Sequence, residues 1–316
     1  MDRHLEGLWQ KRGSNEVMIV RPDFLVIGAM KSMTSSLHDQ LSLSPELNLS
    51  TLKEPCFFSD DENFTRGTEW YASCWKNPHG EAFLGESSTH YSKLPTYPDT
   101  VSRMYEFCPD VKLIYVIRNP IDRLVSQYIH EWTVGRISVP IDIAIHRYPM
   151  LVDYSRYAFQ LRPYFEFFEP RKMLVVSFES LKCNPSASLF EISNHLGLRE
   201  SIEWDHSVTP SNVSSRRMKT SRMRDAVVHA PGIDWMRKKI VPQSVRNRIK
   251  DLWRMKDRPE LSSRSIKHLR SIFDEDLIEL SGQLEATAGK SVDAQSDGRN
   301  PRRHSSPVAS KTEGVV

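Results

Sequence analysis

Three short apolar runs, each followed by a helical pattern, constrain the fold more than any other feature of this chain. The runs are Phe24–Ile27, Leu113–Ile117 and Met173–Phe178. Apolar runs of this length are typical of strands buried on both faces, and strands that alternate with helices indicate a parallel sheet. We therefore expect an α/β fold with a central, mainly parallel sheet flanked by helices, which binds its ligands beyond the carboxyl ends of the strands.

The expected helices follow from apolar spacing and from residues that begin or end helices. Asn119 is suited to cap a helix that Pro120 begins, because proline at the first helical position sacrifices no hydrogen bond, and Gly197 is suited to end another. Helices are expected from about Thr34, over Val101–Phe107, from Pro120, near Tyr154–Phe168 and near Ser186–Leu196, with a short strand over Ala82–Gly85. A last helix is expected where Ile266, Leu269, Phe273, Leu277 and Leu280 share one face.

The composition indicates a soluble globular protein. The chain has 316 residues, of which 39% are hydrophobic and 26% charged, and its formal net charge is +3. We expect an irregular lead-in over residues 1–20, one domain over residues 21–284, and a disordered tail over residues 285–316, where large apolar residues are almost absent. No stretch approaches the ~20 apolar residues of a membrane span, and the N-terminus lacks the apolar core of a signal peptide.

The cysteines indicate the cellular compartment of the protein, and the basic residues indicate what kind of ligand it could bind. The four cysteines show no metal-ligand spacing, which argues against a disulfide framework or a bound metal and favours the cytoplasm. Between Arg216 and Arg254 there are twelve Lys or Arg residues and three Asp residues, so this segment could face a phosphorylated ligand. It lacks the interleaved aromatic residues and the motifs of a nucleic-acid-binding protein, and we expect no nucleic-acid partner.

The segment GAMKSMTSSLH, which begins at Gly28, has the composition of an anion-binding turn. The first N–H groups of a helix have no partner within the helix and carry a partial positive charge. Lys31 would add a full positive charge, and Thr34, Ser35 and Ser36 would add hydroxyl donors. The alternative is that Gly28 only makes a tight turn and Thr34 only caps the helix.

A second polar pair follows the strand that ends at Ile117. Arg118 lies at the carboxyl end of that strand, and Ser126 lies about two helical turns further on, so both can face the same crevice. The planar fork of arginine suits a phosphate group. Two anion sites at neighbouring strand ends indicate a ligand with two separated phosphate-like groups, unless Arg118 forms a salt bridge and Ser126 is a surface residue.

In order and spacing, these motifs resemble those of sulfotransferases that use 3′-phosphoadenosine 5′-phosphosulfate (PAPS), in particular bacterial members and heparan-type glycan sulfotransferase domains. The matching segments are GAMKSMTSSLH from Gly28, KEPCFF from Lys53, GESSTHY from Gly85 and RNPIDRLVS from Arg118. The resemblance covers roughly residues 21–200 and implies a P-loop-like, three-layer form of the α/β fold.

The resemblance also implies a reaction, in which a sulfuryl group passes from PAPS to an acceptor hydroxyl, leaving 3′,5′-ADP and needing no metal. The acceptor it suggests is a carbohydrate or glycolipid, and the alternative is a small alcohol or phenol. Lys31 matches a catalytic lysine and Glu54 the general base, unless Lys53 pairs with Glu54 at the surface. The implied cofactor-binding residues are Lys31, Ser32, Met33, Thr34, Ser35 and Ser36 at the 5′-phosphosulfate, Arg118 and Ser126 at the 3′-phosphate, and Arg216 over the nucleotide.

Three residues depart from the pattern of this family, namely Met33, Ser87 and Thr89, the last of which stands where many bacterial members have proline. Met33 replaces the glycine of the first loop, so the backbone there must either avoid positive φ or accept strain, and the side chain would crowd the phosphosulfate. Ser87 replaces a lysine that some glycan-specific members place beside the acceptor. These departures leave open a nucleotide-binding protein of the same fold that has lost catalysis.

A P-loop kinase of a small molecule is the remaining alternative. It would need a lysine next to the hydroxyl residue in a GK[ST] sequence and an acidic Mg²⁺ ligand at a strand end. Neither feature follows Gly28 or Ile117. The identity of the acceptor, the oligomeric state and the roles of residues 216–254 and of the tail do not follow from any pattern in the sequence.

Overall fold

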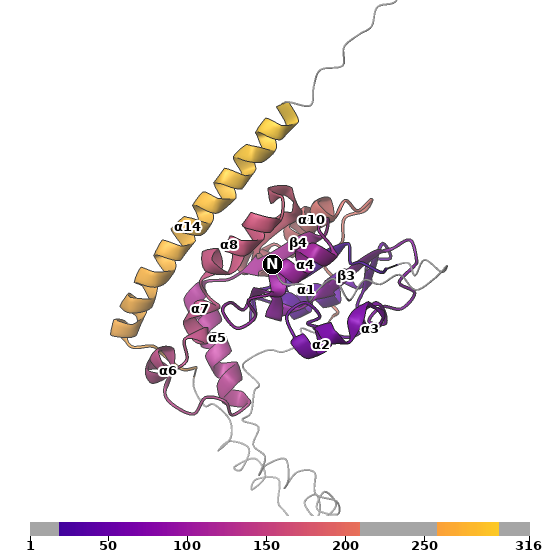
Figure 1. Ribbon diagram of the computed structural model, residues 1–316. Coiled ribbons are helices and arrows are strands. Elements are labelled where there is room, and N and C mark those ends of the chain that lie inside the picture. The colour runs from indigo at the N-terminus through magenta and orange to yellow at the C-terminus, as the bar shows by residue number, and fades with distance from the viewer. Residues whose placement is uncertain (1–18, 209–257, 297–316) are drawn as a thin grey trace, which may run out of the picture.

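Five parallel strands form the centre of the fold, in the order β2-β3-β1-β4-β5. The computed structural model describes residues 19–208 and 258–296, and all strand pairs within these residues are parallel (Figure 1). The strands are β1 (Phe24–Gly28), β2 (Leu47–Leu49), β3 (Phe83–Ser87), β4 (Lys112–Ile117) and β5 (Met173–Ser177). The expected α/β fold with a parallel sheet is confirmed, although the short strand β2 was not anticipated.

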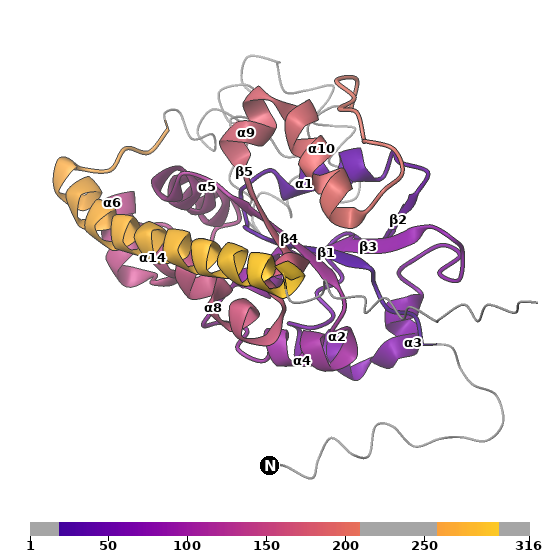
Figure 2. The same ribbon diagram turned by 90° about the horizontal axis from the view of Figure 1, so that it is seen from above.

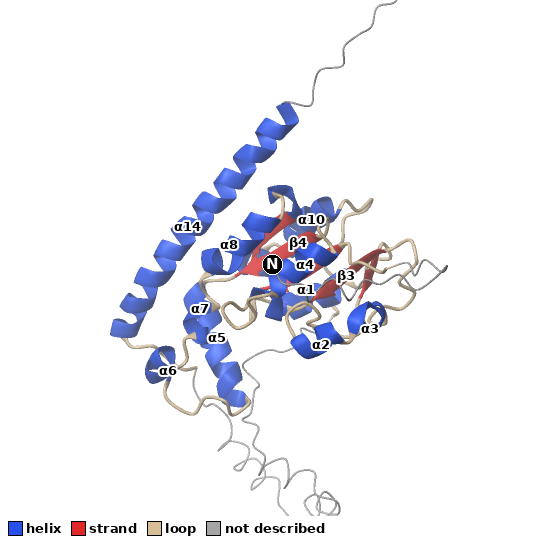
Figure 3. Cartoon of the chain, in the orientation of Figure 1, coloured by secondary structure: helices blue, strands red, loops and turns tan. Residues whose placement is uncertain are grey.

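Helices cover both faces of the sheet and complete the three layers (Figures 2 and 3). One face carries α1 (Thr34–Leu41), α9 (Phe178–Cys183) and α10 (Pro185–Leu196). The other carries α2 (Asp61–Thr65), α3 (Gly67–Ala72), α4 (Thr100–Phe107) and α8 (Tyr157–Phe167). A third apolar cluster joins α5 (Pro120–Thr133), α6 (Ile141–Arg147), α7 (Met150–Asp153) and the first part of α14 (Ser263–Ser296).

The strand β1 shows why the apolar runs predict this architecture. Leu25 and Ile27 pack into the cluster on the α4 and α8 face, and Phe24 and Val26 pack into the cluster on the α1 and α10 face. All four side chains are fully buried. Because successive side chains of a strand point to opposite faces, only a run that is apolar throughout can be covered on both sides.

The expected helix ends agree with the structure except after β5. The Oδ1 atom of Asn119 accepts hydrogen bonds from the first N–H groups of α5, and Gly197 ends α10 with φ 80°. The strand expected to reach Phe178 ends one residue earlier, because the Ser177 hydroxyl accepts hydrogen bonds from Glu179 N and Ser180 N and so begins α9. The helix expected near Tyr154–Phe168 is α8, which α7 precedes.

The last helix extends beyond its expected end. α14 runs alongside α8 (Figure 2), and Asp276 fixes it there, because its carboxylate accepts hydrogen bonds from Ala158 N at 2.9 Å and Phe159 N at 3.2 Å. The disorder expected from residue 285 is wrong as far as Ser296, since helix-favouring Ala, Glu and Lys residues continue α14 without large apolar side chains. Residues 1–18 and 297–316, where we expected the lead-in and the rest of the tail, lie outside the described residues.

Two expectations about the whole chain can also be compared with the structure. Cys56, Cys74, Cys108 and Cys183 are all free thiols, and all but Cys183 are buried. Within residues 19–208 and 258–296, no helix combines the length and the apolar character needed to cross a membrane.

Candidate active site

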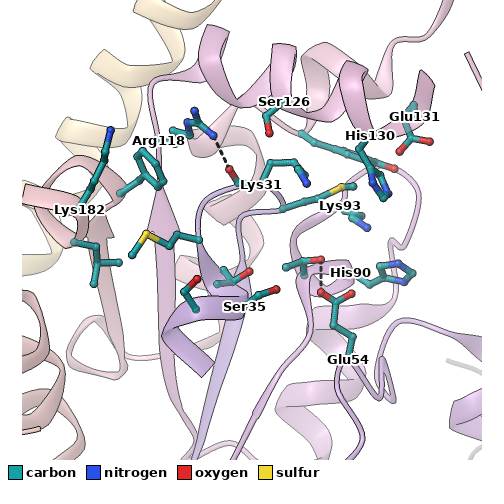
Figure 4. A pocket seen from close by; sticks show the side chains of 18 of the residues that line it. Lys31, Ser35, Glu54, His90, Lys93, Arg118, Ser126, His130, Glu131 and Lys182 are labelled. Carbon is teal, nitrogen blue, oxygen red and sulfur yellow. Dashed lines mark hydrogen bonds between the residues drawn. The ribbon is translucent and has the colours of Figure 1, made fainter. Parts of the chain in front are cut away.

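A cavity of about 970 Å³ lies at the carboxyl ends of β1, β3 and β4, where a parallel sheet is expected to bind its ligand. Its walls come from the loops after these strands and from α1, α5 and α9 (Figure 4). The predicted site residues that line it are Lys31, Met33, Thr34, Ser35, Ser36, Glu54, Arg118 and Ser126. Residues from three distant segments of the sequence thus meet in one cavity.

The first loop presents the start of α1 to this cavity. Lys31 and Met33 have left-handed backbone conformations, with φ 72° and 70°, on either side of Ser32. The first backbone hydrogen bond of the helix runs from Leu37 N to Met33 O, at 3.0 Å. The N–H groups of residues 34–36 precede that bond, so they are the unpaired donors with which a helix N-terminus binds an anion.

Met33 keeps the backbone conformation that a glycine would adopt. Of the two expected alternatives, strain is therefore the one observed, because a left-handed conformation costs a residue with a side chain about 1–2 kcal/mol. The side chain is half-buried against the apolar cluster that holds α1 and α10 to the sheet, and it also forms part of the cavity wall. Met33 thus narrows the cavity beside the unpaired N–H groups while contributing to the core.

Arg118 connects the two expected anion sites. Its Nη1 donates a hydrogen bond to the carbonyl oxygen of Lys31 at 3.0 Å, and its guanidinium lies 4.4 Å from the centre of the Phe178 ring. The hydroxyl of Tyr157 donates to the carbonyl oxygen of Arg118 at 2.7 Å and fixes the end of β4. In the described part of the chain Arg118 forms no ion pair, which argues against the salt-bridge alternative, and Ser126 lines the cavity instead of lying on the surface.

Glu54 lies across the cavity from Arg118 (Figure 4). It is half-buried, and its Oε1 accepts a hydrogen bond from the hydroxyl of Thr89 at 3.3 Å. Lys53 is exposed and forms no ion pair with Glu54, as far as the described residues show. The surface-pair alternative is therefore not supported, and Glu54 faces the space in which an acceptor would lie.

Two predicted residues do not join the cavity in the described structure. Ser32 is fully buried and its side chain does not line the cavity, because the left-handed residues on both sides of it turn it inward. Its N–H donates to the carbonyl oxygen of Ala29 at 3.1 Å, within the turn. Arg216, with the basic segment 216–254, lies outside the described residues.

Lys93 lines the cavity although no motif indicated it, and His90, which lies within GESSTHY, lines the cavity beside it. Lys93 is only 9% exposed, and burial lowers the pKa of its amine to about 8. Burial, aided by Lys93, lowers the pKa of His90 to about 4, and the His90 ring stacks on Tyr97 with 4.8 Å between centroids. Ser87, where some family members have a lysine, is buried and bonded to His38 at 2.9 Å, so that position does not face the cavity.

Glu54, Cys56 and His90 each offer one atom that could bind a metal, and these atoms all lie within 4.8 Å of one another. Burial, together with Glu54 and Glu86, raises the pKa of the Cys56 thiol to about 12, so the thiolate that a metal requires is disfavoured. The nearby Lys93 ammonium further opposes a second cation. The expected reaction without a metal stays a prediction, and the protonated thiol and the nearby ammonium group favour it.

The fold and the cavity define an α/β protein with an anion-binding arrangement at the carboxyl ends of its strands, and comparison with known proteins specifies the family. A family model described as the sulfotransferase domain matches residues 21–281. The chain belongs to the sulfotransferase family, as its motifs indicate.

Two similar proteins act on heparan sulfate according to their names, and one solved structure shares the fold. Human bifunctional heparan sulfate N-deacetylase/N-sulfotransferase 2 is 26% identical over 227 residues, which cover 64% of this chain and 25% of that protein. Mouse heparan sulfate glucosamine 3-O-sulfotransferase 3B1 is 28% identical over 195 residues, which cover 58% of this chain and 48% of that protein. A sulfotransferase from Alicyclobacillus acidocaldarius has a TM-score of 0.51 and 27% identity, covering 59% of this chain and 87% of its own.

Replacing Met33 by glycine is expected to tighten the binding of 3′,5′-ADP several-fold. Glycine adopts the left-handed conformation without a side-chain clash, and the change removes a side chain from the cavity wall. Isothermal titration calorimetry measures the affinity directly, and Met33→Ala is the matched control, since it shortens the side chain but keeps the strained backbone. Weaker binding in both variants would instead show that Met33 is a working part of the loop.

Proposed function

We propose that this protein transfers a sulfuryl group from PAPS to a hydroxyl group of a carbohydrate or glycolipid. One observation carries the proposal: the hydrogen bond from Arg118 to the Lys31 carbonyl joins two anion-binding elements in a cavity that also contains Glu54. A ligand with phosphate groups at both ends of a nucleoside would engage both elements. Family membership supports the same reading.

The residues suit an in-line transfer. By resemblance, the turn at Lys31 holds the 5′-phosphosulfate, and Arg118 with Ser126 holds the 3′-phosphate. The S–O bond to the 5′-phosphate breaks while a bond from sulfur to the acceptor oxygen forms, and the electron pair of the broken bond stays on the phosphate beside Lys31. Glu54 takes the acceptor proton, so the protein aligns the reactants and stabilises the charge that develops.

A glycan is the acceptor class that we favour. The names of the similar heparan sulfate enzymes support it, although this chain spans only about a quarter to a half of their length. Near Glu54, the stacked rings of His90 and Tyr97 offer an apolar surface of the kind on which a sugar ring can lie. A small alcohol or phenol is the alternative acceptor, and we propose the cytoplasm, where the four free thiols would persist, as the location.

The donor site should distinguish 3′,5′-ADP from ATP with Mg²⁺. At a 100-fold excess over Kd, 3′,5′-ADP is expected to raise the Tm by about 5 °C. Because each phosphate has its own contact, Lys31→Ala and Arg118→Ala should each lose most of this shift, as differential scanning fluorimetry can measure. Exposed Lys76 provides the control Lys76→Ala, which should keep the shift. Preference for ATP would contradict the sulfotransferase proposal, and an unchanged shift in both cavity variants would contradict the site.

The enzyme should also transfer sulfuryl groups in a way that depends on Glu54. With ³⁵S-labelled PAPS, we expect transfer to at least one of N-unsubstituted heparosan oligosaccharide, N-sulfated heparosan oligosaccharide, octyl glucoside and p-nitrophenol. Glu54→Gln keeps the size of the side chain but not the base, and should reduce kcat about 100-fold while leaving 3′,5′-ADP binding unchanged. Binding of 3′,5′-ADP without transfer to any acceptor would favour the alternative, a nucleotide-binding protein that has lost catalysis.

A further inference from the structure

Lys93 places a buried ammonium group in the cavity, on the same side as Glu54 (Figure 4). Its side chain is 9% exposed and lines the cavity. Within residues 19–208 and 258–296, the amine has neither a hydrogen bond nor an ion pair, although its backbone carbonyl accepts bonds from Thr96 N and Tyr97 N. The amine opens into the cavity instead of being sealed in the core, so an anionic group of a ligand in the cavity can pair with it.

The backbone that carries Lys93 is fixed on both sides. Before it, the hydroxyl of Ser92 donates to the carbonyl oxygen of Ile27 at 2.8 Å, at the end of β1. After it, the side-chain amide of Gln160 accepts from Leu94 N at 2.7 Å and donates to Leu94 O at 2.9 Å. Gln160 is fully buried in α8, so Lys93 stands on a rigid support and is not a mobile surface lysine.

The charges around Lys93 favour its protonated form at neutral pH. Burial lowers the pKa of Lys93 to about 8, and the positive charge of Arg123 lowers it further. Glu54, Cys56 and Glu131 act in the opposite direction and raise it. His90, from the turn before Lys93, also faces it, and its low pKa leaves it neutral. Near pH 7 the cavity therefore holds an ammonium group close to the proposed base.

We propose that Lys93 is a second catalytic lysine, which contacts an oxygen of the sulfuryl group as that group passes to the acceptor. The inference rests on the proposed function. Lys31 would balance charge on the leaving phosphate, whereas Lys93 would balance charge on the sulfuryl oxygens from the side of the acceptor. Lys93 keeps its proton throughout the step, because Glu54 takes the proton that the acceptor loses.

The substitution Lys93→Met tests this role, because methionine nearly preserves the volume and removes the charge. We expect kcat to fall about 100-fold with ³⁵S-labelled PAPS and the best acceptor of the panel above, while the affinity for 3′,5′-ADP stays within twofold. The Tm should stay the same or rise, since a buried charge is replaced by an apolar group. A purely structural role predicts a lower Tm and weaker 3′,5′-ADP binding instead, and Lys76→Met, at an exposed position, is the control.

The pH profile provides the second readout. If protonated Lys93 is required, kcat should decline above pH 8, and Lys93→Arg should retain part of the activity and move this decline upward by at least one pH unit. Burial also raises the pKa of Glu86 to about 8, so Glu86→Gln is the necessary comparison, and it should leave the decline in place. Loss of the decline in Glu86→Gln, or no movement of it in Lys93→Arg, would overturn the assignment.

The same assays separate this inference from the function on which it rests. Wild-type transfer with unimpaired transfer by Lys93→Met would overturn the role of Lys93 alone. No transfer by the wild-type protein to any acceptor would overturn the proposed function and this inference together.

Discussion

The contact between Gly28 and Ser92 holds the two sides of the cavity together. The Ser92 hydroxyl donates to the carbonyl oxygen of Ile27, and a Cβ atom at Gly28 would lie 2.0 Å from that hydroxyl and 2.8 Å from the Tyr115 ring. Only glycine therefore lets the end of β1 approach the segment after β3 so closely. The loop with Lys31 follows β1 and the segment with Lys93 follows Ser92, so this one packing constraint fixes two segments whose lysines both line the cavity.

The two sides of the cavity differ in how they hold charge. On the side that we propose for the nucleotide, backbone N–H groups and the Arg118 guanidinium, anchored to the Lys31 carbonyl, form a positive surface that suits phosphate. On the side that we propose for the acceptor, Glu54 and Lys93 line the cavity, and burial lowers the pKa of both Lys93 and His90. Burial of an ionisable group costs stability, and groups with shifted pKa values cluster at functional sites.

The sequence indicates which residues of the loop after β1 and of the end of β4 reach the cavity, but it does not indicate Lys93, for a physical reason. A turn after a buried strand is a local structure, so Gly28, Lys31 and Arg118 can be placed from neighbouring residues alone. The side chain of Ser32 points inward because Lys31 and Met33, on either side of it, have left-handed backbone conformations. Lysine has no preference for this conformation, so the sequence does not predict it. The position of Lys93 depends on the hydrogen bonds of its neighbours, from Ser92 to Ile27 in β1 and from Leu94 to Gln160 in α8. These partners are distant in the sequence, so the pattern GESSTHYSKLP does not predict that Lys93 lines the cavity.

The proposed binding of the two phosphate groups is tested most directly by the ³¹P NMR spectrum of 3′,5′-ADP bound to the protein and to its Lys31→Ala and Arg118→Ala variants. We propose that the 5′-phosphate binds the first loop and that the 3′-phosphate binds Arg118. We therefore expect Lys31→Ala to move mainly the bound 5′-phosphate resonance and Arg118→Ala to move mainly the 3′-phosphate resonance. Resonances that move together in both variants, or that respond in the opposite order, would contradict the arrangement on which the proposed reaction depends.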